Sequence, residues 1–418
     1  MRRRHFIKTT ATGALAPLAT SAFAQQQQSG RIPKETIDAT KARIKPITAD
    51  ERLKRIERAR ELMTEQNMDA LLFEGGTTLS YFTGVSWGRS ERLFAMILPK
   101  NGEPQYIAPK FEESRAQEQV APMNRGRLLT WEEHESPYAL VHQILTDSGV
   151  LTGTLGIEET TRSFVTEGVA QTLSSVKLVS GTPVTAGCRS VKSAHEIELM
   201  QIADDMTMEV FKTAVPLLRE GMKEQEFGGI ISSLFREFGV GGGALVLFGE
   251  ASAYPHGTVK EHVLREGDIV LIDGGCSVQG YASDITRTIC FGKPTEKMKN
   301  VFTIVRDAQS AGLAAAKPGV AAEDIDAAAR KVIVDAGYGP DYKYFTHRLG
   351  HGIGMEGHEW YYLVRGNKRK EEPGNTHSNE PGIYIPGEFG IRLEDEMLIT
   401  EHGAKLLLTQ SESLEKMF

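Results

Sequence analysis

One order of elements occurs twice in the second half of the chain, and this repeat limits the possible folds more than any other feature. The first copy predicts, in order, a helix from a capping box at Ser193-Ala-His-Glu196 through Leu218, a helix at 227–238, and strands at 245–248, 269–273 and 283–291. The second copy predicts a helix capped by Thr295 and ending near Gly319, a helix at 322–336, and strands around 378–385 and 391–400. Two helices followed by strands, twice over, indicate a pseudo-duplicated α+β domain over residues 187–418, with ligands on strands of both halves.

A different alternation precedes this domain. A helix is predicted from Ala49, and further helices at 137–145 and 164–173. Strands are predicted at 69–73, 93–98, 105–108, 127–131 and 154–157. This order predicts an N-terminal α/β domain over residues 49–182. Residues 25–48 are polar, without apolar periodicity, and are predicted to be a linker.

The first 24 residues have the features of an export signal. A basic start with paired arginines precedes a modest apolar stretch that ends in Ala22-Phe23-Ala24. The arginine pair before Phe-Ile-Lys resembles the twin-arginine signal, which predicts a periplasmic or secreted protein that uses the twin-arginine translocation machinery. A disordered basic tail is the alternative.

Charge and composition exclude some classes of function. The formal net charge is -7. Residues 1–24 contain four basic residues and no acidic ones, so 44 basic and 55 acidic residues remain after their removal, a net charge of -11. An acidic chain is unlike a nucleic-acid binder, and no apolar stretch is long enough to anchor the processed protein in a membrane. The three cysteines, Cys188, Cys276 and Cys290, make no disulfide framework and receive no chemical role.

Five polar residues interrupt the apolar strands of the second domain: Asp273, Asp284, His351, Glu380 and Glu394. Taken singly, such an aspartate is most often a turn former, and a glutamate a solvated edge. Together they would be costly to bury, because neighbouring carboxylates repel in a medium of low dielectric. Two divalent cations would neutralise the four carboxylates. The sequence therefore predicts two divalent metal ions, most simply Mn²⁺ for an oxygen-rich donor set with one imidazole, with Co²⁺ or Zn²⁺ as alternatives.

The spacing of these residues resembles the pita-bread-fold metallopeptidases of family M24, and most closely the Xaa-Pro peptidases, aminopeptidase P and prolidase. The matching stretches are Tyr254-Pro-His256-Gly, Asp273-Gly-Gly, Ser283-Asp284-Ile-Thr-Arg-Thr288, His351-Gly-Ile-Gly-Met-Glu-Gly-His358-Glu, Asn379-Glu380-Pro-Gly-Ile-Tyr384 and Arg392-Leu-Glu394-Asp. The resemblance covers the chain from about Arg189 onward and, more loosely, the N-terminal domain. It implies a creatinase/aminopeptidase-type catalytic domain preceded by a creatinase-like α/β domain.

The resemblance implies a role for each of the five ligands. Asp273 is expected to chelate one metal ion, and Asp284 and Glu394 to bridge both. His351 and Glu380 are expected to complete the shell of the second ion. Glu380 would also carry a proton from the bridging hydroxide to the leaving nitrogen.

Three further histidines match positions that line the family's active site. His256 is expected to bind substrate and to act in catalysis, and His358 to stabilise the tetrahedral intermediate. His347 is expected to contact substrate. The alternative for each is a core or surface histidine that is hydrogen-bonded to the backbone.

Two more residues are expected on the substrate side. Arg392 would orient substrate, or would instead make a structural salt bridge to Asp395 or Glu394. Tyr384 lies in the Glu380 motif and is expected to contact substrate.

The implied activity is hydrolysis of the Xaa-Pro bond at the N-terminus of dipeptides or short peptides through a metal-bridging hydroxide. Small proline-containing peptides are the expected partners, and the N-terminal domain is expected to shape the pocket and to support a homodimer. Tyr361 stands where the family usually has proline, and His377 where an apolar aromatic is common. These departures concern substrate preference rather than the metal site.

Other activities remain open at this point. Methionine aminopeptidases share the metal motifs but generally lack a large leading domain, and creatinase lacks the metal ligands. Phosphotriester hydrolases and enzymes that cleave sulfonium substrates by elimination share the ligand set. Non-catalytic peptide-binding modules of this fold typically lose ligands, and none of the five is missing here.

Overall fold

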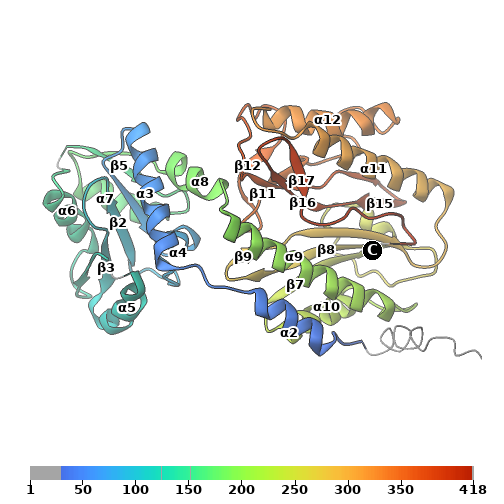
Figure 1. Ribbon diagram of the computed structural model, residues 1–418, viewed down its shortest axis with the longest axis horizontal. Coiled ribbons are helices and arrows are strands. Elements are labelled where there is room, and N and C mark those ends of the chain that lie inside the picture. The colour runs from blue at the N-terminus through green and yellow to red at the C-terminus, as the bar shows by residue number, and fades with distance from the viewer. Residues whose placement is uncertain (1–29, 124, 151, 417–418) are drawn as a thin grey trace, which may run out of the picture.

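Two domains joined by two short chain segments make up the computed structural model, which describes residues 30–123, 125–150 and 152–416 (Figure 1). The predicted export signal lies outside the described residues. One joining segment connects helices α2 (Lys34–Arg43) and α3 (Ala49–Glu65), and the other connects α8 (Thr182–Ser190) and α9 (Ala194–Ala214). Among the described residues, no helix is both long enough and apolar enough to cross a bilayer.

The N-terminal domain is built on one six-stranded mixed sheet in the order β4-β3-β2-β1-β5-β6. Its strands are β1 (Ala70–Glu74), β2 (Ala95–Pro99), β3 (Gln105–Pro109), β4 (Arg127–Trp131), β5 (Thr154–Ile157) and β6 (Lys177–Ser180). Its helices, besides α3 and α8, are α4 (Thr77–Thr83), α5 (Glu113–Val120), α6 (Pro137–Asp147) and α7 (Ser163–Thr172). The helix predicted from Ala49 is present, with Thr48 and Glu51 forming its capping box. Because α8 packs through Val184 and Cys188 into this core, the domain extends to about residue 190 rather than 182.

The repeated order predicted for the second domain is confirmed. The first half contains α9, α10 (Glu224–Phe238), β7 (Gly242–Phe248), β8 (Ile269–Val278), β9 (Tyr281–Ala282) and β10 (Ile285–Cys290). The second half contains α11 (Glu296–Ala315), α12 (Ala322–Asp335), β11 (Gly350–Gly352), β12 (Glu359–Leu363), β13 (Thr376–Asn379), β14 (Gly382–Ile385), β15 (Phe389–Arg392), β16 (Asp395–Ile399) and β17 (Ala404–Leu406). Ser193 and Thr295 cap α9 and α11, as the sequence predicts.

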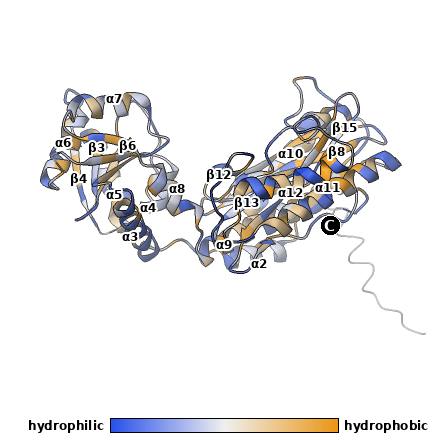
Figure 2. Ribbon diagram, turned by 90° about the horizontal axis from the view of Figure 1, so that it is seen from above, coloured by the Kyte–Doolittle hydropathy of each residue, from blue (hydrophilic) through white to orange (hydrophobic). Residues whose placement is uncertain are grey.

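The strands of this domain lie between two helix pairs (Figure 1). Its sheets have the orders β10-β8-β7 and β12-β11-β13-β16-β17, and β14 pairs with β15. Helices α9 and α10 share one apolar core with β8, and α11 and α12 share a second core with the strands of the other half. In Figure 2 the apolar stretch of β8 lies inside the domain, and hydrophilic stretches lie on the outer faces of the helices.

The linker predicted for residues 25–48 is wrong for residues 34–43, which form α2. This helix is anchored by isoleucines on either side of it rather than by a periodic apolar face. Ile32 and Ile47 are buried in the α9–α10 core, and Ile37 and Ile44 pack against that core. The segment therefore belongs structurally to the second domain, although the chain next enters the first.

Candidate metal centre

An antiparallel pair of strands places the two aspartates side by side. Asp273 lies in β8, Asp284 lies directly before β10, and Thr286 of β10 is the register partner of Asp273. The strands approach closely here: a Cβ on Gly275 would lie 2.0 Å from the Ser283 carbonyl oxygen. Only glycine fits such an approach, which explains Gly275, and Gly274 is as close to β7, where an added Cβ would lie 2.2 Å from the Gly243 carbonyl oxygen.

The other three predicted ligands come from the second half. His351 lies in β11, Glu380 follows the last residue of β13, and Glu394 lies between β15 and β16. The single strands predicted around 378–385 and 391–400 are each two strands in different sheets. Pro381, which has no N–H to donate, begins the first break. Glu380 and Glu394 therefore stand where the chain passes from one sheet to another.

A single β-bridge joins the two halves at the site. It pairs Thr286 with Glu394: the Glu394 N–H donates to the Thr286 carbonyl at 3.2 Å, and the Thr286 hydroxyl donates to Glu394 Oε2 at 2.6 Å. Behind it, the fully buried Arg287 donates to the Glu394 carbonyl at 2.7 Å and pairs with Asp395 at 2.6 Å. Removing one partner of such a buried ion pair typically costs about 3–5 kcal/mol. The bridge and this pair therefore fix the Glu394 backbone.

The five predicted ligands meet in two overlapping groups. In each group the potential ligand atoms lie within 4.8 Å of one another. One group is Asp273, Asp284 and Glu394, and the other is His351, Glu380 and Glu394. Because both groups contain Glu394, they form two adjacent candidate positions for metal ions. They open into a cavity of about 140 Å³ lined by Pro255, His256, Asp273, Asp284, His347, Arg348, His351, His358, Glu380, Arg392 and Glu394.

Burial and mutual repulsion perturb the acids of this cavity. Burial first, and then the Asp273 charge, raises the pKa of Asp284 well above its ordinary value. Burial and the Asp284 and Glu380 charges do the same to the pKa of Glu394. Burial raises the pKa of Glu380 to about 7. A cluster that resists ionisation in the protein alone is the kind of donor set that divalent cations stabilise, so these residues fit a metal pair.

The imidazole of His351 is oriented so that one of its nitrogens could bind a metal ion. Its Nδ1–H donates to the Gly352 carbonyl at 3.1 Å, which leaves Nε2 facing Glu380 Oε1 at 3.3 Å and Asp284 Oδ2 at 3.8 Å. Burial and the neighbouring His358 lower the pKa of His351 to about 3, so the ring is neutral. A backbone acceptor on one nitrogen is the usual means of directing the other nitrogen to a metal.

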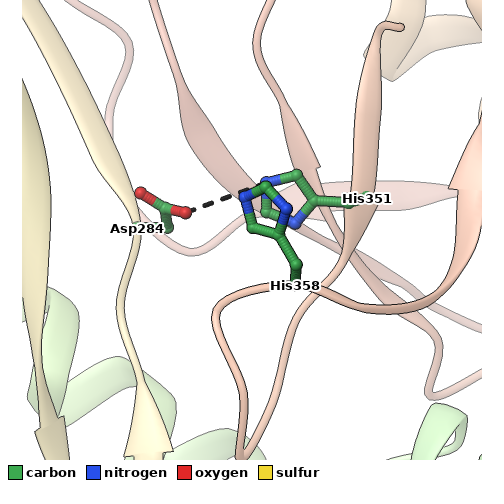
Figure 3. Close-up of side chains that lie close together, drawn as sticks. All are labelled: Asp284, His351 and His358. Carbon is green, nitrogen blue, oxygen red and sulfur yellow. Dashed lines mark ion pairs between the residues drawn. The ribbon is translucent and has the colours of Figure 1, made fainter. Parts of the chain in front are cut away.

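His358 lies against His351 in a stacked arrangement with ring centroids 3.8 Å apart (Figure 3). Burial and Arg348 lower its pKa. Its nitrogen also falls within reach of Asp284 and His351, which makes a third group of possible ligands. The structure therefore brings His358 to the centre, and its predicted role toward the intermediate stays a prediction.

The remaining predicted residues are held differently from one another. His256 lines the cavity, but Tyr384 does not. His347 lines it with both nitrogens engaged: Nδ1 with the Arg348 carbonyl at 2.8 Å and Nε2 with the Tyr384 hydroxyl at 2.7 Å. Tyr384 therefore contacts two residues that line the cavity, His347 and Arg392, but does not line it itself.

The guanidinium of Arg392 is hydrogen-bonded to other residues of the protein. It pairs with Asp273 at 2.5 Å, rather than with Asp395 or Glu394, and also donates to Thr286 and to the Pro255 carbonyl. It therefore orients Asp273, a candidate metal ligand, and the substrate contact predicted for it stays a prediction.

The sequence prediction missed Arg348, a cation that lines the cavity. Its guanidinium lies over the Tyr362 ring, 3.9 Å from the centroid. Among the described residues it has no hydrogen-bond or ion-pair partner for its side chain. The only signal in the sequence was its place in the glycine-punctuated segment between His347 and His351.

The raised pKa values predict how pH affects the protein without metal. Asp284, Glu380 and Glu394 bind protons more tightly in the folded than in the unfolded chain, so stability is greatest below their ordinary pKa values and falls as pH rises through the folded ones. In EDTA, urea titrations from pH 4.5 to pH 7 should show a falling free energy of unfolding, by about 3 kcal/mol from Glu380 alone at about 1.4 kcal/mol per pKa unit. With Mn²⁺ present the trend should reverse, because ligation requires ionised carboxylates. Equal stability across this range in EDTA would contradict the prediction.

Comparison with known proteins agrees with this geometry. Residues 198–401 match the model of metallopeptidase family M24, and residues 55–191 match that of the creatinase/prolidase N-terminal domain. An uncharacterized peptidase of Schizosaccharomyces pombe is 37% identical over 83% of this chain and 78% of its own. A dipeptidase from Mycobacterium ulcerans is 30% identical with a TM-score of 0.82, covering 89% of this chain and 99% of its own. A prolidase from Thermococcus sibiricus is 31% identical with a TM-score of 0.76, covering 85% and 96%. With both domains matched, the chain belongs to metallopeptidase family M24, in the form that carries a creatinase/prolidase N-terminal domain.

Proposed function

We propose that this peptidase is an Xaa-Pro exopeptidase that depends on two divalent metal ions and acts on dipeptides or short peptides. The observation that carries the proposal is the pair of ligand groups that share Glu394 at the cavity. Asp273, Asp284 and Glu394 would hold one ion. His351 and Glu380, together with the shared carboxylates of Asp284 and Glu394, would hold the other. When bound, such a pair polarises a carbonyl and acidifies water. The oxygen-rich donors favour Mn²⁺, with Co²⁺ or Zn²⁺ as alternatives.

Residues of the chain itself would handle the proton and the substrate. Glu380 accepts a hydrogen bond from the Ser378 hydroxyl at 3.1 Å on Oε1, while its Oε2 lies 3.8 Å from His347 Nδ1. A carboxyl group at this position takes a proton from water and returns it to the leaving nitrogen. His256 and His358 line the cavity, where each would donate a hydrogen bond to the oxygen of the scissile carbonyl.

This arrangement suits a bond before proline. The Xaa-Pro amide has no N–H, and proline restricts the preceding residue, so recognition by extended strand pairing fails. The cavity is lined by imidazoles, carboxylates and two guanidinium groups. Recognition would therefore depend on the ends of a small substrate.

Arg348 supports a preference for the shortest substrates. Its guanidinium is the one cavity cation without an ion-pair partner among the described residues, whereas Arg392 is paired with Asp273. An unpaired guanidinium next to the reaction centre suits a carboxylate, through charge-assisted hydrogen bonds. In an Xaa-Pro dipeptide the free carboxylate lies one residue beyond the scissile bond. We therefore propose that the protein prefers Xaa-Pro dipeptides to longer peptides as substrates.

The experiment that tests the activity uses residues 25–418 loaded with Mn²⁺. It compares Xaa-Pro, Xaa-Pro-Xaa and Met-Ala peptides. Cleavage of Xaa-Pro peptides supports the proposal, and the ratio between dipeptide and tripeptide reports the length preference. Cleavage of Met-Ala alone, or of none of the three, overturns it in favour of a methionine aminopeptidase, a non-peptidase hydrolase or lyase, or a peptide-binding module.

Export and assembly are further parts of the proposal. The basic, paired-arginine start supports translocation in the folded state and cleavage after Ala24, which would release the protein to the periplasm or medium without a membrane anchor. Replacing Arg3 and Arg4 by lysine should leave uncleaved precursor in the cytoplasm, as read by immunoblot of cell fractions. Mature protein outside the cytoplasm in that variant would contradict this route. A homodimer is proposed on the resemblance alone, and sedimentation would test it.

A further inference from the structure

The loop that carries His358 is tied to the junction between the domains. Glu359, the next residue, is 4% exposed. Its carboxylate forms ion pairs with Arg189 Nη2 at 2.6 Å and with Lys192 Nζ at 2.9 Å. Arg189 lies in the last turn of α8 of the N-terminal domain, and Lys192 lies between α8 and α9. Glu359 also accepts the Met355 N–H at 2.9 Å, so one carboxylate fixes both the turn of the loop and its attachment.

The attachment leaves no spare room. A Cβ on Gly354 would lie 2.8 Å from Glu359 Oε2 and 2.8 Å from Lys192 Cε, and the Gly354 carbonyl accepts the Ala282 N–H at 2.7 Å. Arg189 continues the connection into the N-terminal domain by donating to the Thr78 hydroxyl at 3.1 Å. Although burial opposes ionisation of Glu359, Lys192 and Arg189 lower its pKa, and the group stays charged.

His358 has little else to hold it. Within the described part of the chain its ring makes no hydrogen bond, and its only ring contact is the stack on His351. Its side chain is exposed, unlike that of Glu359. The position of His358 over the metal centre therefore depends on where Glu359 is anchored.

We infer that Arg189 and Lys192 are positioning residues for His358: through Glu359, the domain junction sets where this imidazole lies over the centre. A misplacement of about 1 Å in a reacting geometry can cost about 100-fold in rate. The kinetic consequence rests on the proposed function, whereas the placement of the ring does not.

The chain offers a matched control at the same junction. Arg55 of α3 pairs with Glu196 of α9 at 3.1 Å, and both side chains are less than 10% exposed. This pair also joins the two domains, but neither residue lies in the loop of His358. Arg55→Met and Lys192→Met each remove one cation from a buried ion pair at the junction between the domains. Lys192→Met leaves Glu359 paired with Arg189, so the variant is expected to fold.

The test combines kinetics with NMR of the Zn²⁺-loaded protein, in which the His358 ring protons are assigned through His358→Asn. Stacked rings shift each other's protons upfield. In Lys192→Met we expect that upfield shift to shrink and kcat on an Xaa-Pro dipeptide to fall at least tenfold, with KM within threefold. Lys192→Arg should restore both. Arg55→Met should lower Tm but leave the shift unchanged and kcat within twofold.

Two outcomes overturn the inference. One is an unchanged ring shift in Lys192→Met. The other is an equal loss of shift and kcat in Arg55→Met, which would mean general loosening of the junction. If no peptide is cleaved by the parent protein, the proposed function fails, and the NMR arm still decides the placement of His358.

Discussion

Asp284→Asn is expected to abolish hydrolysis of an Xaa-Pro dipeptide, with kcat/KM at least 1000-fold lower, a loss of about 4 kcal/mol in transition-state stabilisation. Asp284 belongs to the group with Asp273 and Glu394 and also to the group with His351 and His358, and its Oδ2 lies 3.8 Å from His351, so the change affects both proposed metal positions. Bound metal, measured by plasma emission spectroscopy after gel filtration, should fall from two ions per chain to one or none. Glu394→Ala should give the same result.

The same variant carries a signature that misfolding cannot produce. Without metal, Asp284 is destabilising, because burial and Asp273 raise its pKa. The amide should therefore raise the Tm of the EDTA-treated protein at neutral pH while it removes activity. Asp335→Asn, at an exposed position in α12, is the control and should change neither quantity. Full activity or full metal content in Asp284→Asn would refute the proposed centre.

The second large effect is expected from Arg348→Met. A charge-assisted hydrogen bond contributes about 1.5–3 kcal/mol, so loss of a carboxylate contact should lower kcat/KM for an Xaa-Pro dipeptide by about 10- to 100-fold. The corresponding Xaa-Pro amide, which has no terminal charge, should be affected less than threefold. Arg348→Lys should retain part of the dipeptide activity, because it keeps the charge but not the planar fork.

Arg369 supplies the matched control for Arg348. It also lies over a tyrosine of β12, with its guanidinium 3.3 Å from the centre of the Tyr361 ring, but it does not line the cavity. Arg369→Met should leave the ratio of dipeptide to amide activity unchanged. If Arg348→Met lowers the dipeptide and amide activities equally, Arg348 supports the structure of the site but does not bind the substrate carboxylate. The proposed preference for dipeptides would then be refuted.

The sequence was sufficient to predict the repeated order of helices and strands, and also the five residues that the structure brings together at the cavity. Asp273, Asp284, His351, Glu380 and Glu394 could be found because buried charge is rare and their spacing matches a family. The capping boxes of α3 and α9 likewise marked helix starts, because a Ser or Thr followed three residues later by Glu satisfies free backbone N–H groups at a helix start.

What could not be predicted depends on contacts between distant segments. A run of apolar residues does not show where a strand leaves one sheet for another, so the breaks at Pro381 and Leu393 were missed. Helix α2 has no periodic apolar face, because its anchors, Ile32 and Ile47, lie outside it. Arg348 was overlooked for a related reason: sequence shows a cation but not whether a partner lies opposite.

The single bridge between Thr286 and Glu394 has a consequence for how the protein matures. Neither half of the repeat holds all five candidate ligands, since the aspartates come from one half and the histidine and glutamates from the other. On the proposed assignment, a fragment containing either half alone would bind divalent ions weakly, and tight binding would begin only once both halves have docked. Ion uptake would then favour the assembled chain by mass action and would serve as a built-in check that synthesis and folding are complete.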